Sequence, residues 1–95
     1  MRNMKFTLFT PHRRFPSVEC DSVRLSIADS ANGKFSGSYG IRKGHAKALF
    51  SLAEGSITAS LDGKDVFSAE CSGGFATVEN DEVRVVADSI KEKQK

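Results

Sequence analysis

The sequence predicts a single all-β domain, and three observations support this prediction. Apolar residues recur at every second position in several short windows, which is the period of a half-buried strand. Turn-forming residues separate these windows at intervals of strand length. The chain has 95 residues, of which 39% are hydrophobic, so there is room for one domain with a modest core and not for two. Several short strands in one domain of this size indicate a β-sandwich or a barrel.

Strands are expected in the windows where the alternation is clearest. Val23, Leu25 and Ile27 alternate with polar or small residues over 22–28 and give the cleanest pattern. None of these windows places apolar residues at the i, i+3 and i+4 spacing of an amphipathic helix. The other predicted strands cover residues 5–10, 56–61, 67–71 and 82–87.

The connections between these windows carry turn signals. Asp62-Gly63 predicts a two-residue hairpin, because both residues tolerate positive φ. Ser72-Gly73-Gly74 indicates a backbone that bends sharply or approaches another strand closely. Further turns are expected at Glu54-Gly55 and Asn80-Asp81, and the loosest connection is expected at 31–34. The glycines assigned to structural turns are Gly44, Gly63, Gly73 and Gly74.

The domain is expected to end near residue 88. Residues 89–95 are polar and are expected to form a short tail, in which Ser89 is suited to cap and begin a helix.

The cysteines and the charge pattern indicate a small soluble domain of the cytosolic type. Cys20 and Cys71 are each in phase with apolar neighbours, so we expect buried free thiols in preference to a disulfide. The net charge is +2, and residues 1–14 hold four basic side chains and no acidic one. Such a basic arm can bind nucleic acid, but the chain lacks the aromatic and arginine motifs that stack on or read bases. The basic residues of this arm are therefore expected to face solvent without binding nucleic acid. No segment has the length of a membrane span or the pattern of a signal peptide.

No residue pattern predicts catalysis, a cofactor site or a metal site. His12, His45, Cys20 and Cys71 have spacings that fit no metal-binding module. Neither a Gly-x-Ser-x-Gly elbow nor an activated cysteine is recognisable. The glycines of residues 37–44 do not form a phosphate-binding loop, because no Gly-Lys-Ser/Thr sequence follows them.

Two segments resemble the ATP synthase epsilon subunit family. Residues 37–46 read Gly-Ser-Tyr-Gly-Ile-Arg-Lys-Gly-His-Ala and, with Leu49, are similar to the family's Gly-x-x-Gly-Ile/Val-x-Pro-Gly-His-Ala-Pro-Leu segment. Residues 72–88 begin with Ser-Gly-Gly-Phe, end with Val-Arg-Val-Val-Ala-Asp, and are similar to a second segment of the family. The order and the separation of the two segments also agree, and the resemblance extends over the chain up to about Asp88.

The resemblance implies a flattened β-sandwich of about ten short strands over residues 1–88. It implies a non-catalytic subunit without cofactors in the central stalk of an F-type ATP synthase, where it links the gamma subunit to the polar loops of the c-ring. There it would couple ion flow to ATP synthesis, a mechanical role that suits a close-packed interior. The implied c-ring contacts are Ser38, Tyr39 and Gly40, and the implied gamma contacts are Thr10 and His45.

The same resemblance implies partners and a location. We expect no nucleic-acid partner and a monomer when the chain is isolated. Within the complex, the chain would be peripheral to the membrane, on the cytoplasmic face of the bacterial inner membrane.

The chain departs from the family pattern in ways that bear on these contacts. Lys43 and Lys47 stand where the family usually has proline, which adds positive charge beside His45. Ser38 stands where the family often has an acid that pairs with a basic c-ring loop, so this contact must be weaker or must come from elsewhere. Candidate replacements are Asp29 and Lys34.

Most family members continue into a C-terminal helical hairpin that regulates ATP hydrolysis. This chain ends at Lys95, which leads us to expect a short form without that autoinhibition, with a truncated chain as the other interpretation.

Some roles and one other function class stay open. Tyr39 is expected to be partly exposed, because tyrosine combines apolar area with a polar tip. His45 is either a satisfied structural histidine in a turn or a gamma contact, and Gly40 and Gly44 are expected to serve backbone conformation. The alternative function is a free-standing β-sandwich binding module that uses the basic N-terminal arm, with a small thiol or metal enzyme as a third possibility.

Overall fold

The computed structural model describes residues 3–28 and 35–92, with the side chains of all of these except Phe35 and Glu92. Within these ranges the chain is all-β, and no helix is present that could cross a membrane. The strands are β1 (Met4–Phe9), β2 (Val18–Cys20), β3 (Ser22–Ala28), β4 (Phe35–Arg42), β5 (Ala48–Leu52), β6 (Gly55–Leu61), β7 (Lys64–Cys71), β8 (Gly74–Glu79), β9 (Glu82–Ala87) and β10 (Ile90–Glu92).

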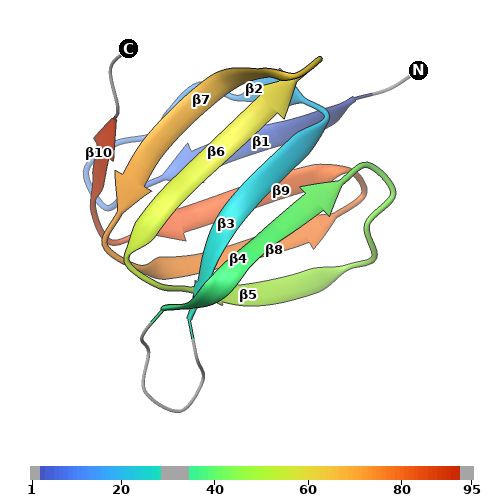
Figure 1. The fold of residues 1–95 in the computed structure, drawn as a ribbon. Helices are drawn as coiled ribbons and strands as arrows, with labels where there is room; N and C mark the ends of the chain where they lie inside the picture. Colours follow the sequence, from blue (N-terminus) through green and yellow to red (C-terminus); the bar gives the residue numbers. More distant parts are fainter. Residues whose placement is uncertain (1–2, 29–34, 93–95) are drawn as a thin grey trace.

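The strands form one sheet that curls into two layers. The strand order is β10-β7-β6-β3-β5-β8-β9-β1-β2, and β4 pairs with the other side of β3. β3 pairs with β6 over Ser22–Arg24 but with β5 only through Ile27 and Leu52, and the sheet folds over at this point. In Figure 1, β7, β6, β3 and β4 run in front of β1, β9, β8 and β5. We call β10, β7, β6, β3 and β4 the front layer and the remaining strands the rear layer. The predicted flattened sandwich is confirmed.

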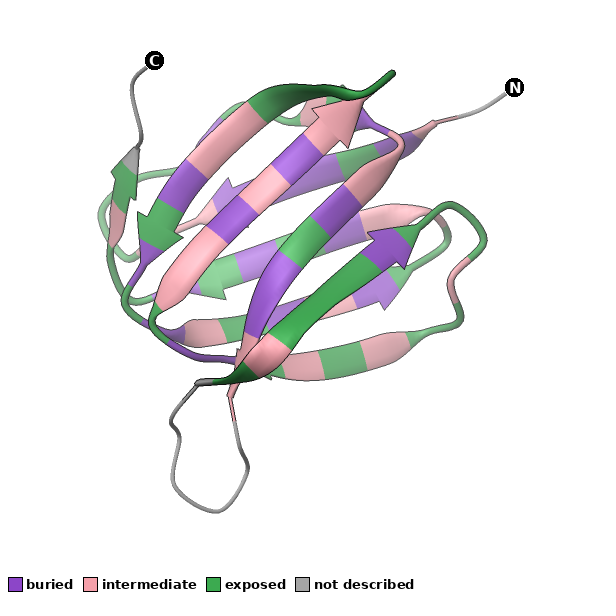
Figure 2. Ribbon diagram, viewed as in Figure 1, coloured by how far each residue is buried: buried purple, intermediate pink, exposed green. Residues whose placement is uncertain are grey.

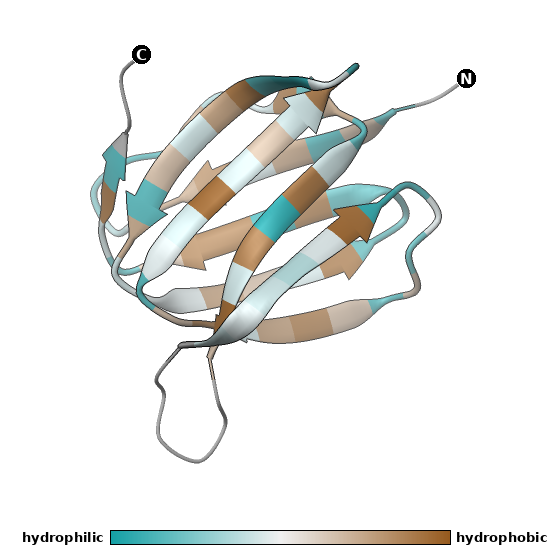
Figure 3. Cartoon of the chain, viewed as in Figure 1, coloured by the Kyte–Doolittle hydropathy of each residue, from teal (hydrophilic) through white to brown (hydrophobic). Residues whose placement is uncertain are grey.

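The core lies between the layers and follows from the period of two. Buried residues alternate with intermediate or exposed ones along β6 and β9 (Figure 2), and the hydrophobic residues of these strands follow the same alternation (Figure 3). The largest buried side chains come from both layers: Phe6, Met4, Leu8, Leu25, Ile41 and Ile57. β1 pairs with β9 in parallel, and the other strand pairs are antiparallel.

Two predicted turns are tight hairpins in the structure. Asp62 and Gly63 have φ values of +53° and +80°, and Asn80 and Asp81 have φ values of +52° and +59°. Positive φ at both central residues is the geometry whose twist matches that of the flanking strands. The loop expected at 31–34 lies outside the described residues.

The expectation of a helix at Ser89 is wrong. Ile90–Glu92 form β10, which pairs antiparallel with β7 in the register Ile90↔Cys71. Ser89 Oγ lies 2.9 Å from Ser72 Oγ, and the Ser72 amide donates to the Ser89 carbonyl at 3.2 Å. The open edge of β7 offers backbone partners and lets Ile90 pack against the core, which a helix of a few residues would not do. The sandwich therefore continues beyond residue 88.

Both cysteines are free and buried, as predicted. Burial raises the pKa of the Cys20 thiol from 9.0 to about 11, and the negative charges of Asp21 and Glu19 add to this effect. Burial also raises the pKa of Cys71, whose thiol lies 3.7 Å from the carbonyl oxygen of Ala53.

The Cys20 thiol is expected to make stability fall with pH in the alkaline range. Its pKa is higher in the folded chain than in the unfolded one, so the unfolded state ionises first and stability is lost between pH 9.0 and about 11. Urea unfolding of the parent and Cys20→Ala at intervals from pH 7 upward measures this contribution. The parent is expected to lose stability relative to the variant above pH 9. A difference between the two proteins that stays constant across this range would contradict the assignment.

Candidate functional site

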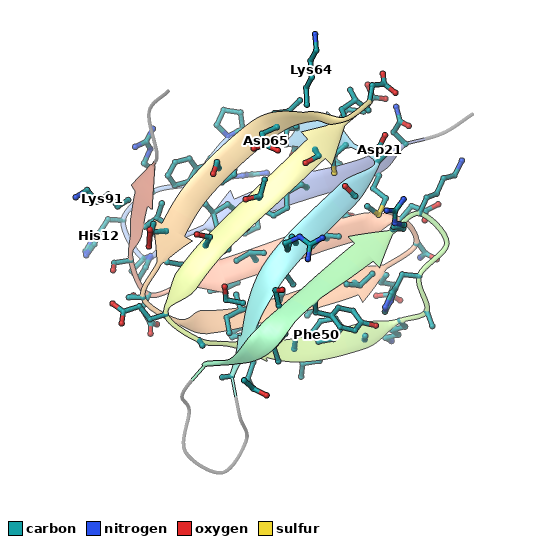
Figure 4. All side chains as sticks on the ribbon, viewed as in Figure 1. His12, Asp21, Phe50, Lys64, Asp65 and Lys91 are labelled. Atoms are coloured by element: carbon teal, nitrogen blue, oxygen red, sulfur yellow. The ribbon has the colours of Figure 1, made fainter. Side chains whose placement is uncertain are left out.

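A cluster of three rings closes the sandwich between β4 and β5. The ring of Tyr39 on β4 lies 4.8 Å from that of Phe50 on β5, and the ring of His45 lies 5.7 Å from that of Tyr39. Figure 4 shows Phe50 between these two strands. Tyr39 is 40% exposed, which agrees with the predicted partial exposure. The phenol therefore packs one side against the sandwich and leaves the other side free to contact a partner.

Hydrogen bonds hold His45 in the turn that connects β4 with β5. Nδ1 lies 2.7 Å from the carbonyl oxygen of Ala46, and Nε2 lies 2.9 Å from the hydroxyl of Tyr39. A carbonyl only accepts, so Nδ1 donates to Ala46, and in the neutral ring Nε2 accepts from Tyr39. The structure thus gives both ring nitrogens intramolecular partners, as expected of a satisfied structural histidine.

The two glycines next to this cluster differ in what they do. Gly44 has a φ of +85°, and its amide donates to Asp81 Oδ1 at 2.8 Å, which ties this turn to the β8–β9 turn. Gly40 has no positive φ and is an ordinary strand residue paired with Arg24. The expectation that Gly40 serves backbone conformation is therefore not met.

The outer face of the rear layer carries a row of exposed apolar side chains. Phe9, Val86 and Phe75 are cross-strand neighbours on β1, β9 and β8, and we call them the apolar row. Val86 is 38% and Phe75 46% exposed, while Phe9 is half-buried with the guanidinium of Arg14 5.5 Å from its ring centre. Large apolar side chains that are both contiguous and exposed indicate an interaction surface.

Further along this face, an exposed leucine is followed by charged side chains. Leu49 on β5 is 70% exposed and pairs with Thr77, two residues along β8 from Phe75. Beyond it, exposed ion pairs join Lys47 with Glu79 at 3.7 Å, and Arg84 with Glu82 at 3.1 Å. Exposed pairs of this kind add little stability, but they give this end of the face a charged and hydrated surface.

The structure places Thr10 and His45 at opposite ends of the rear layer. Thr10 follows the apolar row on β1, and its hydroxyl donates to the Arg13 carbonyl at 3.2 Å. His45 lies at the other end, next to the turn that Gly44 joins to Asp81. One partner that contacts both residues must therefore extend along the length of the rear layer.

Sequence reasoning singled out none of the apolar-row residues as a binding residue. A signal was present in consecutive apolar residues such as Leu8-Phe9 and Val85-Val86, which break the period of two. In each of these pairs one side chain must face outward, because neighbouring residues of a strand point to opposite faces.

The predicted c-ring residues lie together on β4. Ser38 and Gly40 are exposed like Tyr39, and β4 pairs only with β3, so it is an edge strand within the described part of the chain. Asp29 and Lys34, the candidate substitutes for an acid at position 38, lie outside the described residues.

Across residues 3–28 and 35–92, no group of three His, Cys, Asp or Glu side chains is placed to hold a metal ion. The exposed edge strand β4 and the apolar row are suited to binding a partner by apolar contact and hydrogen bonding.

Comparisons with known proteins point to one family. The family model for the β-sandwich domain of the ATP synthase delta/epsilon chain matches residues 3–93. The ATP synthase epsilon chain of Myxococcus xanthus (strain DK1622) is 33% identical over 91 residues, which cover 96% of this chain and 61% of that protein. The epsilon chain of Paracoccus denitrificans (strain Pd 1222) is 35% identical over 86 residues, covering 90% and 53% of the two chains. The epsilon chain of Chlorobium limicola is 33% identical over 86 residues, and the match covers 90% of each chain.

Two solved structures share the fold. The central stalk and c-ring structure of the Tetrahymena thermophila mitochondrial ATP synthase contains a chain with a TM-score of 0.72 at 14% identity, covering 96% of this chain and 67% of that one. The Euglena gracilis mitochondrial ATP synthase contains one with a TM-score of 0.76 at 20% identity, covering 97% and 54%.

Proposed function

Because the chain belongs to the ATP synthase delta/epsilon chain family through its β-sandwich domain, we propose that it is a rotor subunit in the central stalk of an F-type ATP synthase. The observation that carries this proposal beyond family membership is the apolar row, an exposed surface of the kind that binds another protein. The subunit is non-catalytic and transmits rotation between the c-ring and the gamma subunit. The chain spans 61% and 53% of the Myxococcus and Paracoccus relatives, so the proposal concerns the sandwich domain.

The gamma subunit binds the outer face of the rear layer in this proposal. The apolar row supplies the apolar centre of the interface, and Thr10 lies directly beside it. The ion pairs around Glu79 and Glu82 form a polar rim toward the His45 end. An apolar centre with a hydrated rim is the usual anatomy of a protein–protein interface.

The c-ring loops contact β4 through Ser38, Tyr39 and Gly40. Tyr39 supplies both apolar ring surface and a hydroxyl, a combination that is enriched at interfaces. Ser38 can only donate or accept a neutral hydrogen bond where the family often has an acid, so this contact depends less on charge. As part of this complex the chain lies at the membrane surface, on the cytoplasmic side of the inner membrane if its source is bacterial like the relatives above.

Co-expression with the gamma subunit of the same genome, followed by size-exclusion chromatography, tests the proposal. The expected result is one peak that contains both chains in equal amounts, with each chain eluting later when expressed alone. Separate elution at micromolar concentrations would contradict a stable link to gamma. A polyanion such as heparin in place of gamma provides the control for binding through the basic N-terminal arm, which would weaken steeply with salt.

A further inference from the structure

A polar hollow lies on the outer face of the front layer, the face opposite to the apolar row. Its volume is about 280 Å³, and Asp65, labelled in Figure 4, marks its β7 side. The side chains and backbone that line the rest of it come from three adjacent strands: Ser22, Val23, Arg24, Gly40, Arg42, Thr58 and Ser60. Unlike the apolar row, this surface presents guanidinium groups and hydroxyls.

The strand register explains why the surface is hollowed there. Arg24 on β3 is paired with Gly40 on one side and with Thr58 on the other, so all three positions share the outer face. A Cβ atom added at Gly40 would have no atom within 4 Å, which means that the floor beside Arg24 is open. Ser22 is likewise paired with Arg42 and with Ser60. The long side chains of Arg24 and Arg42 therefore lie beside small residues, and the space between the two arginines is open.

The hollow has an excess of positive charge. In the part of the chain that the structure describes, neither Arg24 nor Arg42 has a hydrogen bond or an ion pair through its side chain. The acidic group in the lining is Asp65, whose Oδ1 already accepts a hydrogen bond from Ser60 Oγ at 3.0 Å. Two guanidinium groups that face one space repel each other, and an anion between them would remove this repulsion.

We propose that this hollow binds a phosphate group between Arg24 and Arg42. The planar fork of arginine matches the oxygens of phosphate, and the hydroxyls of Ser22 and Thr58 can donate further hydrogen bonds. The lining contains no aromatic side chain, so nothing in it would stack on a nucleobase. The space suits the phosphate itself, either as the free ion or as the headgroup of an anionic phospholipid. The hollow shares Gly40 with the surface proposed above to contact the c-ring, so this inference concerns the free sandwich.

Titration of the folded chain with sodium phosphate at constant ionic strength, followed by the amide resonances of Ser22, Gly40 and Thr58, tests the proposal. Shifts at these amides are expected to saturate. Arg24→Gln and Arg42→Gln are each expected to weaken binding about tenfold, because each removes a charged donor pair. Asp65→Asn is expected to strengthen binding. Arg84→Gln, which removes one positive charge from an exposed arginine that pairs with Glu82 in the rear layer, is the control for net charge and is expected to leave phosphate binding unchanged.

Gly40→Val separates a shaped site from diffuse attraction to positive charge. The substitution fills the hollow without altering any charge, and β-branched residues are suited to strands. It is expected to abolish saturable binding. Gly37→Val is its control, since Gly37 also has open space but lies outside the lining.

Sedimentation with phosphatidylglycerol vesicles, compared with phosphatidylcholine vesicles, distinguishes the two sources of phosphate. Saturable binding of the free ion that is lost in Gly40→Val supports a site for free phosphate. Sedimentation with phosphatidylglycerol alone, again lost in Gly40→Val, supports a headgroup site. If neither ligand binds, or if Arg84→Gln weakens binding as much as Arg24→Gln does, the proposal is overturned.

Discussion

Replacing Phe75 with Asp is expected to weaken binding to the gamma subunit by about 30-fold or more and to leave the sandwich folded. Phe75 is 46% exposed between Val86 and Ser51 on neighbouring strands, so the new carboxylate can stay hydrated in the free chain. In the proposed complex the same carboxylate would be buried against an apolar surface without a partner. Loss of a central aromatic anchor alone costs about 2 kcal/mol or more, which corresponds to about 30-fold in affinity.

Val66→Asp provides the matched control for this measurement. Val66 is an apolar residue of similar exposure, 42%, but it lies at an irregularity of β7 in the front layer. Its substitution is expected to leave the dissociation constant for gamma unchanged, as measured by titration calorimetry. Equal losses from both substitutions would mean that charge at any exposed apolar position is enough to weaken binding, and the apolar row would lose its assigned role.

Replacing Gly74 with Ala is expected to destabilise the fold by at least about 3 kcal/mol or to prevent folding. Gly74 has a φ of +142°, a conformation that side chains rarely adopt. An added Cβ would overlap the carbonyl oxygen of Val86 and would come within 2.9 Å of Ala87 Cα. These are backbone atoms of the paired strand β9, so they cannot move away without breaking the β8–β9 ladder.

The neighbouring glycine separates steric overlap from backbone strain. Gly73 has a similar φ of +132°, but a Cβ there would lie 3.6 Å from the Leu52 carbonyl oxygen, which is ordinary contact. Gly73→Ala is therefore expected to cost only the strain, about 1–2 kcal/mol. Urea unfolding followed by circular dichroism measures both. Indistinguishable midpoints for the two variants would refute the close approach at Gly74.

Several features of this fold were determined by local sequence. The alternation of Val23, Leu25 and Ile27 specifies which face of β3 meets the core, since one face of that strand is polar. Asp62-Gly63 and Asn80-Asp81 specify their hairpins because few other residue pairs accept positive φ at both positions. The order of two short motifs identified the family without any knowledge of the structure.

The residues of the candidate site were predicted less completely. Ser38, Tyr39 and Gly40 do lie together on an exposed strand, but Thr10 and His45 are separated by the length of the rear layer. The apolar row and the hollow join residues from distant parts of the chain, and their composition depends on strand register. Register is not visible in any single window of sequence.

Only the tertiary structure decided the remaining elements. Residues 35–42 carry glycines and serines with little alternation, and they form β4 because β3 supplies backbone partners along most of their length. Ile90–Glu92 likewise become a strand because the edge of β7 is open to them. The local pattern determines a strand when one face is exposed to solvent and the other is buried. Each apolar side chain is then stabilised by pointing inward, and each polar side chain by pointing outward. Where both faces carry similar side chains, the conformation is determined by whichever neighbouring strand satisfies the backbone hydrogen bonds.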